Sequence, residues 1–105
     1  MNIEFEDKAL EELYENGHTA IKPYNRLSKD VIVRYVKVVN YMKAACRIEN
    51  LYLINSLHYE KKKGNLKGVD VVRINDKYRL HFRSTPNKQG IVVNAILTDI
   101  TKHYE

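Results

Sequence analysis

Residues 61–83, KKKGNLKGVDVVRINDKYRLHFR, decide how this chain folds and hold eight of its 18 Lys and Arg residues. After Lys77 the apolar and basic side chains alternate strictly: Tyr78, Arg79, Leu80, His81, Phe82 and Arg83. Because successive side chains of a strand point to opposite faces of a sheet, this pattern predicts a strand with one packed face and one cationic face.

The same alternation predicts the register of a hairpin. If residues 75–77 form a three-residue connection, Arg73 lies opposite Arg79 and the apolar residues of both strands share one face. A two-residue turn would instead place Arg73 on the apolar face beside Tyr78, which would bury an unpaired charge. Two opposed arginines repel each other unless an anion lies between them, so the pair indicates a phosphate clamp. The alternative is an ordinary solvated strand face.

Around this hairpin the sequence predicts an α+β fold, with two amino-terminal helices packed on one face of an antiparallel sheet. The long helix begins at Ser28 and continues through Cys46, which we interpret as a small core residue. Its segment VIVRYVKVV is rich in β-branched residues, and a strand is the alternative there. The other expected elements are a strand at 2–5, a helix at 7–16 ended by Gly17, a short helical turn within 48–57, and strands at 69–74, 78–83 and 91–99.

Length and charge limit the classes of function. At 105 residues and 12.4 kDa, we expect one domain spanning residues 1–105, with a core that needs no disulfide or structural metal. The formal net charge of +5 lies entirely in residues 58–105, since residues 1–57 are neutral overall. A basic face on a small domain indicates nucleic acid or an acidic protein as partner.

Other features indicate where the protein acts. A single cysteine, an acidic amino terminus and the lack of a membrane-length apolar run predict a cytoplasmic protein with no membrane partner. The four histidines are scattered and show no metal-ligand spacing, so we expect neither a metal site nor a cofactor.

Two motifs and a tail resemble a known family. The segment KGNLKG at 63–68 looks like a K-G-[DN]-x-x-G loop, and VRINDKYRL at 72–80 looks like an S-[IV]-R-[IV]-N-x-[QK]-[WY]-R-[IL] hairpin. With a terminal His103, they are similar to the HigB-like (plasmid maintenance system killer) branch of the RelE/ParE toxin superfamily, whose members have a microbial-ribonuclease-type fold.

The resemblance implies the toxin of a type II toxin–antitoxin system, which cleaves messenger RNA at the translating ribosome. It also implies a helix-turn-helix antitoxin, with operator DNA bound only through the toxin–antitoxin complex. Matched by motif, Lys63 resembles the catalytic loop lysine, Arg73 and Arg79 resemble the arginines that hold the scissile phosphate, and His103 resembles the carboxy-terminal histidine.

The chain departs from the family pattern at two places. Many relatives end in Asp-Tyr-His, whereas this chain reads DITKHYE from Asp99 onward. Many relatives also have a histidine three residues before the loop lysine, where this chain has Glu60 and, at a different offset, His58.

These residue types suit metal-independent RNA cleavage, in which the ribose 2′-hydroxyl attacks the phosphate. The reaction needs a base, an acid and cations near the phosphorane. Arg73 and Arg79 suit the cationic role, and one such donor is typically worth about 3 kcal/mol of barrier. His103 can serve as acid or base at neutral pH, and Lys63 can serve as base only if its neighbours lower its pKa. Further RNA-binding candidates are Lys61, Lys67, His81, Arg83 and Tyr104.

Two other functions remain open on the same fold. One is a ParE-like gyrase inhibitor, and the other is a catalytically inactive RNA-binding module.

Overall fold

The computed structural model describes residues 1–61 and 68–102. The elements follow one another as β1 (Asn2–Phe5), α1 (Lys8–Asn16), the 3₁₀ turn η1 (Tyr24–Arg26), α2 (Lys29–Ala44), α3 (Glu49–Tyr52), the 3₁₀ turn η2 (Asn55–Leu57), β2 (Glu60–Lys61), β3 (Val69–Arg73), β4 (Tyr78–Arg83) and β5 (Asn94–Lys102). The fold is therefore α+β, as the sequence predicted. No helix in the described ranges is long and apolar enough to span a bilayer.

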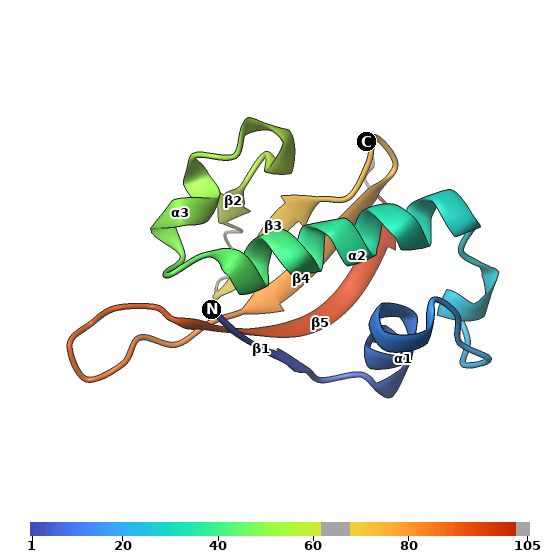
Figure 1. Ribbon diagram of the computed structural model, residues 1–105, viewed down its shortest axis with the longest axis horizontal. Coiled ribbons are helices and arrows are strands. Elements are labelled where there is room, and N and C mark those ends of the chain that lie inside the picture. The colour runs from blue at the N-terminus through green and yellow to red at the C-terminus, as the bar shows by residue number, and fades with distance from the viewer. Residues whose placement is uncertain (62–67, 103–105) are drawn as a thin grey trace.

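The described strands form one sheet in the order β1-β5-β4-β3-β2 (Figure 1). The pairs β2–β3, β3–β4 and β4–β5 are antiparallel, but β1 runs parallel to β5. The expectation of a wholly antiparallel sheet was thus wrong at one edge. Hairpin turns impose antiparallel pairing on neighbouring strands, whereas β1 reaches β5 only after the whole intervening chain, so no local turn sets its direction.

Local signals set the ends of the two main helices. The Asp7 carboxylate accepts a hydrogen bond from the Ala9 amide at 2.8 Å, and the Ser28 hydroxyl accepts one from the Val31 amide at 3.3 Å. Gly17 ends α1 with φ 79°, a left-handed conformation that costs glycine little. The helix α2 ends at Ala44, before Cys46, which is exposed. The prediction of Cys46 as a core residue was therefore wrong.

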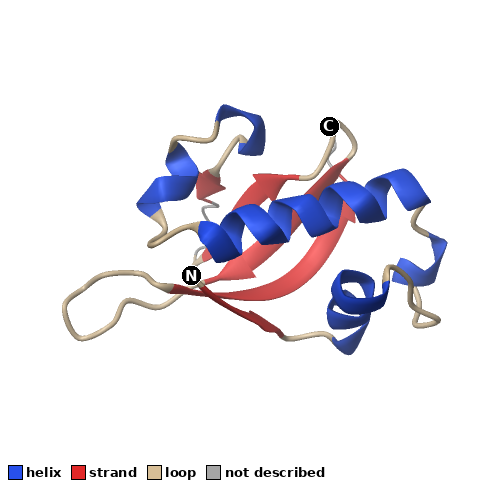
Figure 2. Ribbon diagram, in the orientation of Figure 1, coloured by secondary structure: helices blue, strands red, loops and turns tan. Residues whose placement is uncertain are grey.

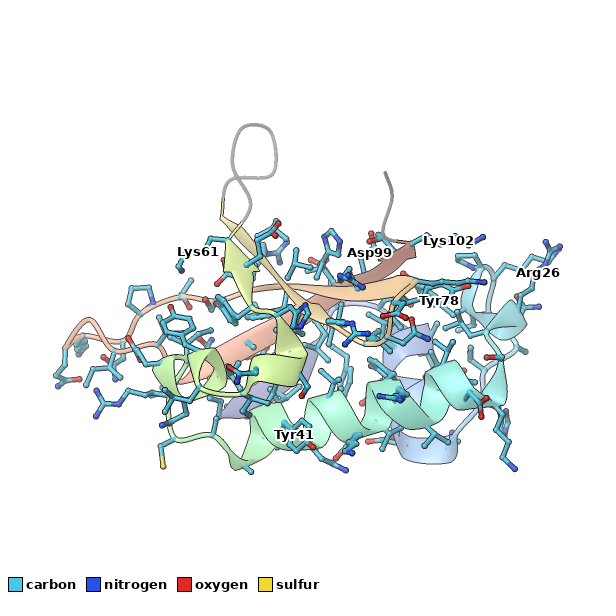
Figure 3. The ribbon with its side chains drawn as sticks, turned by 90° about the horizontal axis from the view of Figure 1, so that it is seen from above. Arg26, Tyr41, Lys61, Tyr78, Asp99 and Lys102 are labelled. Carbon is cyan, nitrogen blue, oxygen red and sulfur yellow. The ribbon has the colours of Figure 1, made fainter. Side chains whose placement is uncertain are left out.

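The core lies between the sheet and the helices. The helix α2 crosses the sheet, and α1 packs against α2 and β1 (Figure 1). Tyr35 of α2 is fully buried and donates a hydrogen bond to the Leu10 carbonyl at 2.8 Å. From the sheet, Leu80, Phe82 and Leu97 are completely buried against the helices. Figure 3 shows that, in the described part of the chain, the helices lie on one side of the sheet and none covers the other.

One predicted strand is shifted along the chain, and one predicted helical turn is confirmed. The strand predicted at 91–99 lies at Asn94–Lys102, because residues 91–93 belong to the long connection that extends beyond the sheet (Figure 2). There Val92 forms a bridge with Pro86 and accepts a hydrogen bond from the Ile48 amide at 3.0 Å. The helical turn expected within 48–57 is present as α3 and η2, which follow α2 and add to the two predicted helices.

Candidate nucleic-acid interface

The hairpin of β3 and β4 has the predicted register. Arg73 lies opposite Arg79, while the neighbouring pair Val72 and Leu80 is completely buried on the helix-covered side. The Ile74 amide donates to the Tyr78 carbonyl at 3.0 Å, and the Asn75 side-chain oxygen accepts from the amide of Tyr78 at 2.8 Å. The three-residue connection is therefore confirmed, and it holds both arginines on the face that the helices leave open.

The Arg79 guanidinium is held against the hairpin turn. Its Nη1 donates to the carbonyls of Asn75 at 2.5 Å, Tyr78 at 3.1 Å and Asp76 at 3.4 Å. Among the described residues, its Nε and Nη2 have no hydrogen-bond partner. The backbone thus fixes Nη1, and no group in the described part of the chain occupies the remaining guanidinium donors, which can therefore bind an anion.

Arg73 is paired with a more exposed carboxylate. Its Nη2 donates to Asp76 Oδ1 across the turn. The Arg73 side chain is 27% exposed and that of Asp76 is 91% exposed. Exposed ion pairs of this kind contribute little free energy, so a phosphate can displace Asp76 at small cost.

The electrostatic surroundings of Arg79 fit an anion site. Burial lowers the pKa of its guanidinium below the ordinary value, and the charge of Arg73 lowers it further. The carboxylates of Asp76 and Glu60 act in the opposite direction. An arginine nevertheless keeps its proton at neutral pH, so the two adjacent charges repel each other, and a bound anion would reduce this repulsion.

The polar row continues across the sheet into β5. Thr101 lies opposite Arg79, and its hydroxyl is 2.7 Å from His81 Nε2. Asp99 lies opposite His81 and accepts a hydrogen bond from the Tyr24 hydroxyl at 2.6 Å. The Ile100 amide donates to the same hydroxyl at 3.2 Å.

Tyr24 therefore acts as a fixed donor to Asp99. Burial raises the pKa of the Tyr24 hydroxyl, and the hydrogen bond to Asp99 raises it further. The phenol stays protonated over the physiological range, so it keeps the end of β5 and the Asp99 carboxylate in place.

Two of the predicted RNA-binding residues have carboxylate partners. Arg83 Nη2 lies 2.8 Å from Glu6 Oε2, with both side chains half exposed. Lys61 Nζ lies 3.4 Å from the buried Asp70 carboxylate. Their charges are thus partly neutralised by the protein itself, as the charge of Arg73 is by Asp76.

Two further cations near Arg73 were missed by sequence reasoning. Arg34 and Lys37 of α2 line, together with Arg73, a small hollow of about 110 Å³ between α2 and the edge of β3. Their three-residue spacing, which puts both on one side of a helix, was the available signal. Because residues 1–57 have no net charge, the charge distribution alone did not indicate these two cations.

The remaining predicted residues, Lys63, Lys67, His103 and Tyr104, lie outside the described residues. The described residues that precede these two segments are Lys61 and Lys102. Figure 3 shows both on the side of the sheet away from Tyr41 and α2. Within residues 1–61 and 68–102, no three His, Cys, Asp or Glu side chains are grouped so as to hold a metal ion.

Comparison with known proteins identifies the family. Residues 3–99 match the model of the family described as RelE-like toxin of type II toxin-antitoxin system HigB. The chain belongs to this family. It is 29% identical over 97 residues to Toxin HigB-1 of Vibrio cholerae serotype O1, a match that covers 92% of this chain and 95% of that protein.

Solved structures show the same fold for this HigB-family chain. A YoeB/ParE toxin from Agrobacterium tumefaciens aligns with a TM-score of 0.61 at 12% identity, covering 99% of this chain and 100% of the other. The YoeB-YefM complex from Staphylococcus aureus aligns with a TM-score of 0.58 at 21% identity, covering 99% and 98%. At these identities the likeness concerns the fold alone.

Proposed function

We propose that this HigB-family toxin is a ribosome-dependent messenger-RNA endonuclease that inhibits translation. The observation that supports the proposal most directly is the Arg73–Arg79 pair, which lies next to the buried Val72–Leu80 pair and therefore on the opposite face of the sheet. Basic side chains on an open face suit a polyanion, and two adjacent guanidinium groups suit a single phosphate with growing charge.

In the proposed reaction the ribose 2′-hydroxyl attacks the adjacent phosphate, and the bond to the 5′-oxygen breaks. Arg73 and Arg79 stabilise the phosphorane, since guanidinium groups supply charge without exchanging a proton. The proton of the 2′-hydroxyl passes to a base and the departing 5′-oxygen receives one from an acid. Lys63 and His103 are the candidates for these two roles. The scheme uses neither a metal ion nor a cofactor.

The flanking basic residues are proposed to bind the RNA on either side of the scissile bond. Lys61, Lys67, Arg83 and His81 contact phosphates, and Tyr104 stacks on a base. Because Lys61 and Arg83 are already paired with Asp70 and Glu6, we expect each to contribute less to binding than Arg79, whose Nε and Nη2 have no hydrogen-bond partner within residues 1–61 and 68–102.

The toxin is proposed to act as one domain spanning residues 1–105 in the cytoplasm, with a helix-turn-helix antitoxin as its cognate partner. The solved YoeB-YefM complex has the same fold on the toxin side and supports an antitoxin partner for this chain. Operator DNA is contacted only through the toxin–antitoxin complex, and the ribosome with its messenger RNA is the target.

The test is primer extension on a defined message incubated with purified toxin, with and without translating ribosomes. We expect cuts within the coding region that need the ribosome. A parallel assay of gyrase supercoiling examines the ParE-like alternative, since DNA breaks without RNA cuts would select it. Ribosome binding without either product would select the inactive RNA-binding module.

A further inference from the structure

A second hollow lies at the β2 edge of the sheet, beside α3 and η2. Its volume is about 540 Å³, within the range of about 300–1,000 Å³ typical of ligand sites. Aromatic, basic and amide side chains line it: Tyr52, Ile54, Asn55, His58, Tyr59 and Lys61. We call it the Tyr52 cleft.

Tyr59 forms the fixed inner wall of the Tyr52 cleft. Its hydroxyl donates a hydrogen bond to the buried Asp70 carboxylate, and its ring packs edge-on against Phe82 with centroids 5.9 Å apart. Burial raises the pKa of the Tyr59 hydroxyl, as does Asp70, so the phenol remains a donor. The inner ring is thus anchored to the core and needs no ligand to order it.

Tyr52 forms the outer wall and is open to solvent. Its ring stands at 73° to that of Tyr59 with centroids 4.7 Å apart, and the residue is 44% exposed. The preceding residue, Leu51, is completely buried and fastens α3 to the core. A large ring is therefore held in one place at the surface, which costs little ordering entropy when a flat ligand binds.

Polar and cationic groups surround the two rings. Lys61 Nζ lies 6.0 Å from the centroid of Tyr59, and the Lys61 side chain is 66% exposed. The exposed His58 has φ 43°, a left-handed conformation that is uncommon outside glycine and occurs more often at functional sites. Together with Asn55, these side chains offer hydrogen-bond donors at the rim of an aromatic cleft.

We propose that the Tyr52 cleft binds a nucleobase of single-stranded RNA, stacked on Tyr52, with Lys61 at the neighbouring phosphate. Aromatic rings combined with cations are the usual platform for unpaired bases, because every base has a stacking face. The inference rests on the proposed function, since it extends the RNA path from the cationic face around β2. The register makes the two surfaces adjacent: Glu60 of β2 lies opposite Val71, which lies opposite His81.

The test uses single-stranded RNA hexamers with 2-aminopurine at one position, since stacking on a tyrosine quenches the fluorescence of this base. We expect wild-type toxin to quench at least one hexamer, Tyr52→Ala to raise the half-saturating concentration about 10-fold, and Tyr52→Phe to retain binding because the ring remains. The matched control is Leu53→Ala. Leu53 is the next residue and is 80% exposed, but it does not line the cleft.

Ribosome-dependent cleavage by the same variants separates the two proposals. We expect Tyr52→Ala to need more translated message for half-maximal rate while its maximal rate stays within about 3-fold of wild type. If the wild type cleaves the message and the Tyr52→Ala and Leu53→Ala variants behave alike in both assays, base binding in the Tyr52 cleft is refuted. The endonuclease proposal is then unaffected. If the wild type does not cleave the message but quenches 2-aminopurine in a way that depends on Tyr52, only the endonuclease proposal is refuted. If the Tyr52→Ala variant binds RNA normally but binds the antitoxin more weakly, the Tyr52 cleft is a site for a protein partner. Base binding in the cleft is then refuted as well.

Discussion

The two faces of the central sheet are built from alternate residues of the same strands, yet they serve different purposes. On one face Leu80 and Phe82 are completely buried beneath the helices. On the other, Arg79 and His81 of the same strand lie in a polar row with Arg73. Because the faces share a backbone but few side-chain contacts, substitutions on one are expected to affect stability and substitutions on the other to affect activity.

The largest expected effect lies on the covered face. Phe82→Ala removes a fully buried ring that contacts Tyr59, and we expect it to lower the free energy of unfolding by about 3–5 kcal/mol. Since small domains are stable by only about 5–15 kcal/mol, much of the toxin would be lost in cells. Chemical denaturation followed by circular dichroism measures the change. A denaturation midpoint equal to wild type would show that this face does not hold the fold together.

The next effect lies on the open face. Arg79→Ala removes the donors at the turn, and we expect cleavage to fall about 100- to 1,000-fold, with loss of growth inhibition. The free energy of unfolding should fall by no more than about 1 kcal/mol, because the lost bonds to turn carbonyls are exposed or half-buried. The control is Lys88→Ala, which removes one positive charge from the exposed connection after β4. Undiminished toxicity of a folded Arg79→Ala variant would contradict the assignment.

The contrast between the two faces also explains which features of the fold could be predicted from the sequence. The hairpin register and the opposed arginines were predictable from the alternation of apolar and charged side chains within residues 72–80. Of the two turn lengths considered, only the three-residue connection avoids burying Arg73. Asp7, Gly17 and Ser28 likewise marked the helix ends through local hydrogen bonds and a left-handed cap. These features depend on residues a few positions apart, where sequence patterns are informative.

Features assembled from distant segments were not predictable in this way. The parallel pairing of β1 with β5 and the shift of β5 to Asn94–Lys102 depend on contacts across most of the chain. The hollow lined by Arg34, Lys37 and Arg73 joins a helix to a strand, and no spacing in the sequence reports that contact. The same holds for the Tyr52 cleft, whose inner ring is fixed by Asp70 from another strand.

A smaller effect tests three tyrosines whose hydroxyls are hydrogen-bonded within the protein, Tyr24, Tyr35 and Tyr59. Burial raises the pKa of the Tyr35 hydroxyl and also that of Tyr24 and Tyr59. A raised folded pKa means that the folded state keeps protons which the unfolded chain releases above about pH 10. Their stabilising contribution is present below that pH and falls as pH rises further. We expect Tm to fall by several degrees between pH 9 and 11.

Absorbance at 295 nm gives the direct readout of tyrosine ionisation. At least three of the eight tyrosines should fail to ionise near pH 10 until the protein unfolds. Ionisation of all eight near pH 10 with the fold intact would show that these hydroxyls are open to solvent.

The smallest expected effect concerns the carboxylate that occupies Arg73. In the free toxin Asp76 is paired with Arg73, and a phosphate must displace it. Asp76→Asn removes the competing charge, so we expect RNA binding to tighten about 2- to 3-fold, in keeping with the small free energy of an exposed pair. Glu15→Gln at the exposed end of α1 changes the net charge by the same unit and serves as control. Equal tightening by both variants would mean that the RNA responds to overall charge alone, whereas an effect confined to Asp76→Asn would locate the phosphate beside Arg73. The measurement is titration of labelled single-stranded RNA at low ionic strength, where so small a difference is least screened.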